Sequence, residues 1–418
     1  MQPKSFWKDY KLFAFLLANI TSSIGSGITA IAIAWLIVKK PGGETIYGYT
    51  LLGVTLASFF LSPYIGTIID RYSRKKYLLF TQLWGGSFVF SFAVYSFLTG
   101  DISIWQLIVL EIVGTLYWSL IFPGIFAFAH EIFHPDQYKK LNSLLEIQSQ
   151  TASLLSAGFA SLMITKVHIS TILFIDTMTY VLGFLLILSI RYIPQIKNKA
   201  PQSMSHWTSM KEGFLYLKKI PWIAIFFISS LMPFIVVMVG NYLNPIHILS
   251  TLKADASAMG IAEALYAVGA ALSGLFMAWL MNRWNMVSAI IFTVFLSFIS
   301  TLLMALIPSL SLFLLLKVFK GVGNAGTRIV RNTVMMEIVP NHLMGRINSS
   351  INGVSLGIRV LLVFSFTQLI HMIGTQGSYF ILSILLFISL ISIYLSKTTI
   401  LSALNKQPFA NQASSSLS

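Results

Sequence analysis

Five basic side chains lie inside long apolar stretches of this 418-residue sequence. Lys317 and Lys320 are three residues apart, a spacing that places two side chains on one face of a helix. Arg359 stands alone in its apolar stretch, whereas Arg328 and Arg331 lie nearer a stretch end, where a topological or latch role is the better interpretation. Charge inside a membrane helix is costly enough to mark a functional site. We therefore take Lys317, Lys320 and Arg359 as candidate substrate-binding residues.

Three acidic residues also fall in apolar stretches and could carry protons: Glu111, Asp176 and Glu263. A carboxyl group that leaves water holds its proton more readily. Glu111 is also a candidate for substrate binding, and an offset of 206 residues pairs it with Lys317, so a structural ion pair between them is the alternative. Asp176 and Glu263 each lie about one helical turn from an outer end, where solvation at the membrane surface is the alternative to proton coupling.

Two polar segments, NITSSIGSG and NYLN, interrupt other apolar stretches. Asn19 in the first and Asn241 in the second are candidate contacts for a substrate. Small polar residues also hydrogen-bond between membrane helices without touching any ligand, and that alternative stays open for both.

The elements that hold these residues follow from composition. The chain is 56% hydrophobic and 10% charged, whereas soluble domains carry about a quarter charged residues. Apolar runs recur at about the 20-residue length that crosses a bilayer as a helix. The sequence predicts an all-α membrane protein with twelve transmembrane helices. The net charge of +15 is not gathered on a solvated domain, so it does not indicate a nucleic-acid partner.

The distribution of basic residues predicts the orientation. Of the 28 Lys and Arg residues, nineteen fall in the N-terminus, the tail and alternate loops, four fall in the other loops and five lie within helices. Lys and Arg are retained on the cytoplasmic side. Both termini are therefore expected in the cytoplasm of a bacterial cell, with the chain crossing the cytoplasmic membrane many times.

The two halves of the sequence repeat. An offset of 212 residues aligns 48–71 with 260–283, and the offset of 206 aligns 131–143 with 337–349. Such internal repeats are typical of secondary transporters. They predict two pseudo-symmetric six-helix bundles.

The predicted boundaries follow the longest polar break. The N-terminal bundle spans 1–190, a cytoplasmic linker 191–221, the C-terminal bundle 222–396 and a cytoplasmic tail 397–418.

The densest charge cluster is GTIIDRYSRKK, Gly66 to Lys76, in the predicted cytoplasmic turn between helices two and three. Cytoplasmic anchoring explains its four basic residues but not Asp70 beside Arg71. A glycine permits close helix approach, and a carboxylate at a helix end can bind a guanidinium or a helix N-terminus. We interpret the segment as a structural latch.

This segment resembles the signature G-x-x-x-D-R-x-x-R-[KR] of the major facilitator superfamily, and the resemblance extends over essentially the whole chain. The first helix and its sequel, SIGSGITAIAIAWLIVKKPGG, resemble the branch with bacterial macrolide-efflux permeases and enterobactin-type siderophore exporters. The resemblance implies that helices one, four, seven and ten line a central cavity. It also implies a conformational latch, whose matching residues are Gly66, Asp70, Arg71, Arg74 and Lys75.

Two departures from the family pattern matter. The C-terminal copy of the signature keeps Arg283 but has Ala278 and Asn282, which implies a weaker second latch. Helix five reads TASLLSAGFASLM, without the Gly-Pro signature of many drug antiporters. That departure argues against a polyspecific drug antiporter.

GVGNAG, Gly321 to Gly326, matches the dinucleotide-binding pattern G-x-G-x-x-G formally. That function needs the pattern between a strand and a helix of a soluble domain, whereas here it interrupts an apolar helix. Close helix packing or a bend is the better interpretation. No cofactor is expected.

The sequence favours a transporter rather than an enzyme: a proton-driven exporter of a small organic molecule that works by alternating access, as a monomer. A pocket with Lys317, Lys320 and Arg359 against Glu111 is net positive and suits a carboxylate-type siderophore, for example a citrate-based one. Macrolides are cationic amines that would favour an acidic pocket. A macrolide or multidrug efflux permease is the alternative, and a sensor or importer on the same fold stays open.

Overall fold

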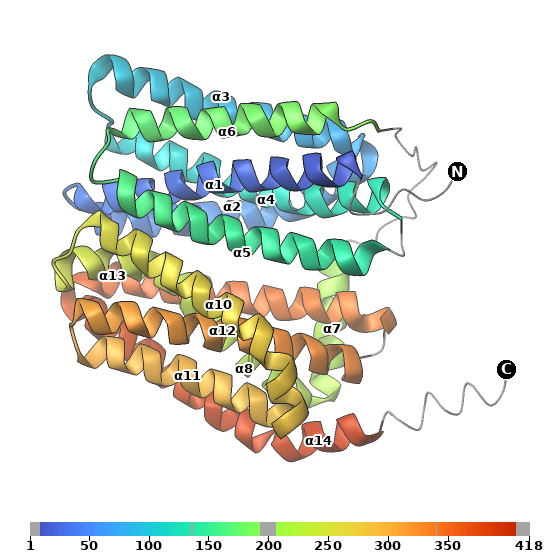
Figure 1. The fold of residues 1–418 in the computed structure, drawn as a ribbon. Coiled ribbons are helices and arrows are strands. Elements are labelled where there is room, and N and C mark those ends of the chain that lie inside the picture. The colour runs from blue at the N-terminus through green and yellow to red at the C-terminus, as the bar shows by residue number, and fades with distance from the viewer. Residues whose placement is uncertain (1–8, 135–136, 193–205, 340, 407–418) are drawn as a thin grey trace. The chain divides into compact units, whose positions relative to one another are not determined.

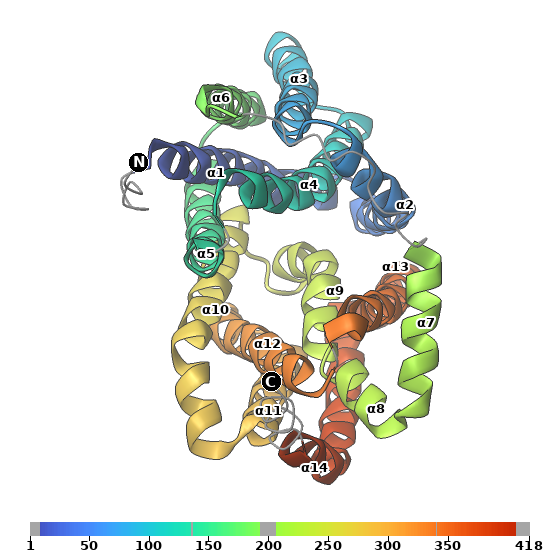
Figure 2. The same cartoon turned by 90° about the vertical axis from the view of Figure 1, so that its right-hand side faces the viewer.

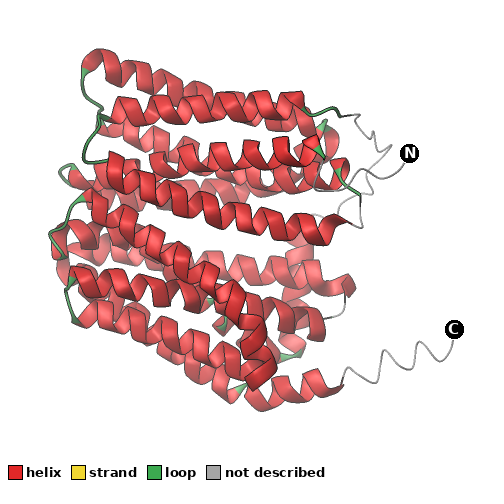
Figure 3. Ribbon diagram, viewed as in Figure 1, coloured by secondary structure: helices red, strands yellow, loops and turns green. Residues whose placement is uncertain are grey.

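The computed structural model describes residues 9–134, 137–192, 206–339 and 341–406. Within these ranges every regular element is a helix, and Figure 3 shows helices joined by short loops with no strand in the part of the chain it colours. This agrees with the fold class that the sequence predicts, an all-α membrane protein.

Residue contacts divide the chain into two compact units. The first unit is Met1–Ser203 with Lys253–Ala264, and the second is Met204–Leu252 with Leu265–Ser418. The predicted boundaries of two bundles, a linker and a tail stay a prediction. The units differ from them at Lys253–Ala264, a segment that belongs with the first unit although it follows helices of the second.

The first unit contains six helices that run side by side (Figure 1). They are α1 (Tyr10–Lys39), α2 (Gly43–Arg71), α3 (Arg74–Thr99), α4 (Ile104–Ile132), α5 (Tyr138–Met163) and α6 (Ile169–Ser189). Helix α1 packs against α2, α4, α5 and α6. Its Phe15 is fully buried between Phe128 and Phe133, with ring centroids 6.0 and 6.1 Å away.

The second unit holds most of the remaining helices. They are α7 (His206–Lys219), α8 (Pro221–Ser229), α9 (Met232–Ile246), a π-helical turn (His247–Thr251), α10 (Ala256–Trp284), α11 (Met286–Leu306), α12 (Leu310–Ile338), α13 (Asn341–Leu395) and α14 (Lys397–Lys406). Helix α10 begins in the segment that belongs with the first unit. Helix α13 is 55 residues long, and its helical backbone is interrupted at Gly374, where φ is +62°.

Helix α7 lies within the predicted linker and packs along α13 (Figure 2). The Nη1 atom of Arg346 lies 2.8 Å from Oε2 of Glu212. A Cβ atom added to Gly213 would lie 2.2 Å from the backbone oxygen of Arg346. The linker therefore contains a helix that is docked on the second unit, which local hydropathy did not predict.

Among the described residues, nine helices are long and apolar enough to cross a membrane. One of them is the continuous stretch Leu343–Leu395, 53 residues long. Helices α5 and α12, of 26 and 29 residues, are not among the nine. The expected count of twelve transmembrane helices therefore stays a prediction.

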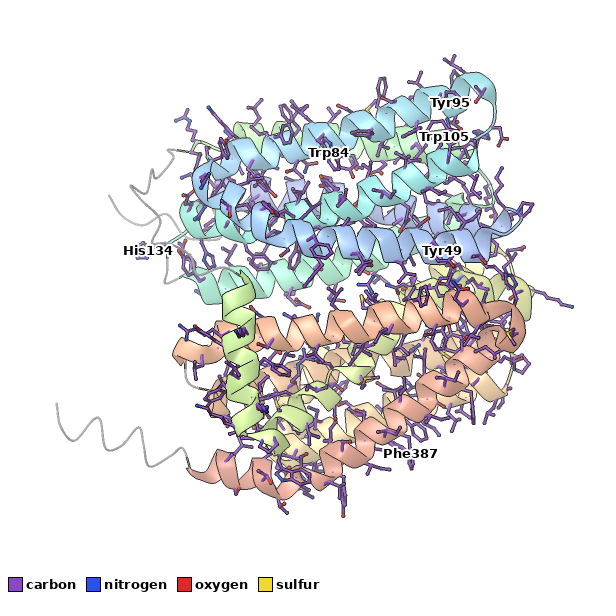
Figure 4. All side chains as sticks on the ribbon, turned by 180° about the vertical axis from the view of Figure 1, so that it is seen from behind. Tyr49, Trp84, Tyr95, Trp105, His134 and Phe387 are labelled. Atoms are coloured by element: carbon purple, nitrogen blue, oxygen red, sulfur yellow. The ribbon has the colours of Figure 1, made fainter. Side chains whose placement is uncertain are left out.

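Large apolar side chains cover much of the outer surface. Figure 4 shows Tyr49, Tyr95, Trp105 and Phe387 on the outside of their helices, and each is about half exposed, between 46% and 55%. In water such exposure would be costly, whereas lipid acyl chains and the interface region accept these side chains. The surface is that of a protein that lies in a bilayer.

Candidate functional site

The basic residues that follow the turn between α2 and α3 fasten the ends of two neighbouring helices. Arg74 donates from Nη1 to the backbone oxygen of Ala127, at 2.6 Å, near the end of α4. Lys75 donates from Nζ to the backbone oxygens of Leu188 and Ile190, both at 2.7 Å, at the end of α6. Cations at a helix C-terminus satisfy its last carbonyl groups and oppose the helix dipole. Arg74 and Lys75 therefore stabilise the first unit itself.

An acid that sequence reasoning did not place in the latch completes this contact. Nε of Arg74 lies 3.6 Å from Oε1 of Glu131 on α4. The hydroxyl group of Tyr192 donates a hydrogen bond to the same carboxylate. Burial and the Glu131 carboxylate raise the pKa of Tyr192 to about 12, so the phenol keeps its proton at neutral pH. The repeat at offset 206 was the signal that could have identified Glu131.

The structure gives less support to the other predicted latch residues, Gly66, Asp70 and Arg71. The side chain of Asp70 lies outside the described part of the structure, and Arg71 is exposed. Their role as a conformational latch stays a prediction. A Cβ atom added to Gly66 would meet no atom within 4 Å. The expectation that Gly66 permits a close helix approach is therefore not met within the first unit.

A buried polar network lies at the centre of the first unit. Gln82 on α3 donates from Nε2 to Oγ of Ser22 on α1, at 2.9 Å. The hydroxyl group of Tyr117 on α4 donates to Oε1 of Gln82, at 3.3 Å. The ring of Tyr117 meets that of Tyr180 on α6 edge to face, with centroids 4.8 Å apart. The network joins α1, α3, α4 and α6. Ser22 belongs to the polar segment NITSSIGSG, whereas sequence reasoning singled out none of the other three side chains.

Asp176 lies on the same helix as Tyr180 and is only 1% exposed. The alternative of a solvated position at the membrane surface is therefore wrong for this residue. The Thr179 hydroxyl group lies 3.4 Å from Oδ1 of Asp176, while Oδ2 has no hydrogen-bond partner among the described residues. A Cβ atom added to Gly25 of α1 would lie 2.7 Å from Oδ1. The same Cβ atom would lie 2.1 Å from Oγ1 of Thr179, so Thr179 and Asp176 both pack closely against Gly25.

The other candidates of the first unit differ in burial: Asn19 is buried like Asp176, whereas the two glutamates are not. Asn19 on α1 is 4% exposed, and its Nδ2 has no hydrogen-bond partner among the described residues. Glu111 on α4 and Glu263 on α10 are partly exposed. The substrate and proton roles of these residues, and the ion pair of Glu111 with Lys317, stay predictions.

The second unit brings the two predicted lysines together with aromatic rings. Lys317 and Lys320 on α12 are each 3% exposed. Nζ of Lys317 lies 5.7 Å from the ring centroid of Tyr266 and 5.9 Å from that of Phe313. Nζ of Lys320 lies 5.2 Å from the ring centroid of Tyr379. The faces of aromatic rings attract cations at these distances, so the rings help to hold two ammonium groups away from water.

Helix α9 adds polar groups to this cluster. The hydroxyl group of Tyr379 donates to Oδ1 of Asn244, at 2.8 Å. His247, fully buried, packs its ring 5.1 Å from the Tyr379 ring and 5.3 Å from the Phe313 ring. We call these seven residues the basic-aromatic cluster: Asn244, His247, Tyr266, Phe313, Lys317, Lys320 and Tyr379. Sequence reasoning found its lysines but missed His247, whose only signal was a histidine within an apolar stretch.

The remaining candidates of the second unit lie outside this cluster. Asn241 is exposed on α9, and Arg359 is partly exposed on α13. Their binding roles stay predictions. The glycines of GVGNAG make close helix contacts: a Cβ atom added to Gly323 would lie 2.7 Å from the backbone oxygen of Thr293 on α11.

Comparison with known proteins agrees with this architecture. The chain is 21% identical over 318 residues to macrolide efflux protein A of Streptococcus pyogenes, covering 75% of this chain and 77% of that protein. It is 21% identical over 245 residues to the uncharacterised MFS-type transporter YfiS of Bacillus subtilis strain 168, covering 57% of each chain.

Solved structures share the fold. A mutant of the nucleoside transporter NupG matches with a TM-score of 0.72 and 15% identity, covering 93% of this chain and 100% of that one. A bacterial homologue of the iron transporter ferroportin matches with a TM-score of 0.69 and 15% identity, covering 96% and 100%. The model of the Major Facilitator Superfamily matches residues 15–248 and 234–414, so the chain belongs to this superfamily and is a multi-pass membrane transporter rather than an enzyme.

Proposed function

We propose that this transporter exports a small organic acid of the carboxylate-siderophore type across the bacterial cytoplasmic membrane, in exchange for protons and as a monomer. The observation that carries the proposal is the burial of Lys317 and Lys320 side by side in the basic-aromatic cluster. A buried ammonium group facing a carboxylate makes a strong charge-assisted hydrogen bond. An anionic cargo therefore suits this cluster.

The charge distribution of the second unit supports an anionic cargo. The sequence of this unit contains two acidic residues, Glu212 and Glu337. Glu212 binds Arg346, and Glu337 is exposed near the end of α12. Neither belongs to the cluster, whose charged members are Lys317 and Lys320.

Proton coupling is supported by the first unit. Asp176 and Glu111 are carboxyl groups within helices that are long and apolar enough to cross a membrane. An acid in such a position is expensive unless it serves transport or pairing. Both acids belong to the first unit, whereas the basic-aromatic cluster belongs to the second.

Macrolide efflux is the second candidate, because macrolide efflux protein A is among the similar proteins. A cationic amine would be drawn to the acids of the first unit and repelled by two lysines of the second. The two candidates therefore differ in their dependence on Lys317 and Lys320.

The test replaces each lysine by methionine, which keeps most of the length of the side chain and removes the charge. Loss of one partner of a buried charged pair costs about 2 to 5 kcal/mol, or about 30-fold or more in affinity. In cells that lack other exporters, Lys317→Met and Lys320→Met should abolish secretion of a citrate-based siderophore. Lys166→Met, at an exposed position, is the matched control.

Protein levels in the membrane must be equal for the comparison to count. Normal siderophore secretion by both variants, together with altered macrolide resistance, would overturn the proposal in favour of macrolide efflux.

A further inference from the structure

His247 is a buried polar member of the basic-aromatic cluster, and the proposed binding of carboxylates by Lys317 and Lys320 gives it no role. It begins a π-helical turn, His247–Thr251, that directly follows α9. Such turns are rare and occur often at functional sites, since the wider turn redirects the side chains that it carries. The imidazole is fully buried.

One edge of the imidazole is fixed by a chain of hydroxyl groups. Nδ1 of His247 lies 2.7 Å from Oγ1 of Thr375, and this oxygen lies 2.8 Å from Oγ1 of Thr251. Thr375 directly follows Gly374, whose positive φ interrupts α13. The contact therefore joins the π-helical turn to the break in α13 and sets the orientation of the ring.

The nitrogen on the other edge of the ring makes no hydrogen bond to the described residues. Nε2 of His247 is buried and has no hydrogen-bond partner among the described residues. Buried polar atoms are nearly always hydrogen-bonded, and an exception calls for an explanation. A ligand group that binds this nitrogen during transport provides one.

The aromatic rings that pack against His247 also pack against the two lysines. The Phe313 ring lies 5.3 Å from the imidazole and 5.9 Å from Nζ of Lys317. The Tyr379 ring lies 5.1 Å from the imidazole and 5.2 Å from Nζ of Lys320. Each aromatic ring thus contacts both the histidine and one ammonium group, so the three nitrogen-bearing side chains share one cluster.

We propose that Nε2 of His247 binds a hydroxyl group of the exported anion while Lys317 and Lys320 bind its carboxylates, which makes hydroxycarboxylates the preferred substrate class. The inference rests on the proposed anion export. In one tautomer Nε2 accepts a hydrogen bond, and in the other it donates one. A hydroxyl group both donates and accepts, so it matches either tautomer.

The test compares two acids that differ by one hydroxyl group, citrate and tricarballylate. Their binding to the purified full-length protein in lipid nanodiscs is measured by calorimetry. The wild type should bind citrate about tenfold more tightly, the worth of one hydrogen bond to a buried group. In His247→Phe this preference should vanish, while the affinity for tricarballylate stays the same.

Three further variants sharpen the comparison. His247→Gln places an amide near the position of Nε2 and should restore part of the preference. Thr375→Val keeps the histidine but removes the hydroxyl group that orients its ring, so it should weaken the preference for citrate. This variant tests the inference even if His247→Phe does not fold. His371→Phe, an exposed histidine on α13, is the control and should behave like the wild type.

The outcomes separate this inference from the proposed function. Equal binding of the two acids to the wild type, lost in Lys317→Met, would keep the anion exporter and overturn the role of His247. A citrate preference that survives in His247→Phe would overturn it as well. Failure of the wild type to bind either acid would overturn the hydroxycarboxylate class, and normal siderophore secretion by both lysine variants would overturn anion export itself.

Discussion

At the scale of single residues, the first unit buries the Asp176 carboxyl group against a glycine of a neighbouring helix. Gly25 leaves the space that the carboxyl group occupies, and Oδ2 has no hydrogen-bond partner among the described residues. Taking a carboxylate out of water without full compensation is costly, and protonation removes much of that cost. These properties suit a group that gains and loses a proton during a transport cycle.

We expect Asp176→Asn to separate coupling from transport. The amide keeps the size of the side chain but cannot release a proton, so accumulation driven by a pH gradient should fall to background. Downhill exchange of substrate should survive, because the helices still move. The measurement is uptake of labelled substrate into inverted vesicles with and without a gradient.

Glu111→Gln is measured beside it to rank the two acids, and Asp101→Asn, at an exposed loop position, serves as control. Full uphill transport by Asp176→Asn would assign coupling elsewhere, with Glu111 and Glu263 as the remaining candidates.

At the scale of elements, two glycines allow α10 and α12 to touch at their backbones. A Cβ atom added to Gly269 would lie 2.0 Å from the backbone oxygen of Val318, and one added to Gly321 would lie 2.2 Å from that of Tyr266. Small residues at membrane helix contacts serve this purpose. The contact sets the distance of Lys317 from Tyr266 on the facing helix.

Gly321→Ala should therefore destabilise the second unit. The added methyl group meets backbone atoms that cannot rotate away, and overpacking of this kind costs about 1 to 3 kcal/mol. The free energy of unfolding is measured by detergent titration of the purified protein. Gly274→Ala on α10 is the matched control, since a Cβ atom there meets nothing within 4 Å. Equal stability of the two variants would contradict the close contact.

At the scale of the whole molecule, the sequence predicts an orientation that the absence of cysteine makes simple to test. The chain contains no Cys, so a single introduced thiol is the only target for a maleimide. Lys76 and Lys166 are both exposed, and the positive-inside rule places the first in the cytoplasm and the second outside.

In intact cells a membrane-impermeant maleimide should label Lys166→Cys and not Lys76→Cys. Both variants should be labelled after the cells are permeabilised, which shows that each thiol is accessible. Labelling of Lys76→Cys in intact cells would reverse the predicted orientation.

The sequence by itself determined the fold class and the family of this protein. Hydropathy is a local property. A run of apolar residues that crosses a bilayer forms a helix, because its backbone N–H and C=O groups must then hydrogen-bond within the segment. The signature around Arg74 and Lys75 was likewise readable, as was the pairing of Lys317 with Lys320 on one helix face. Each of these signals lies within one segment of the chain.

Only the tertiary structure decided which polar groups meet. His247 and Thr375 are 128 residues apart, and Gln82 and Ser22 are 60 residues apart. Asp176 packs against Gly25 of another helix. Lys75 donates hydrogen bonds to backbone carbonyl groups at the end of α6. In a membrane protein both lipid-facing and core-facing sides of a helix are apolar, so periodicity does not reveal which side faces a partner. That choice is made by packing between helices, where a hydrogen bond or a glycine contact selects one rotation over the others.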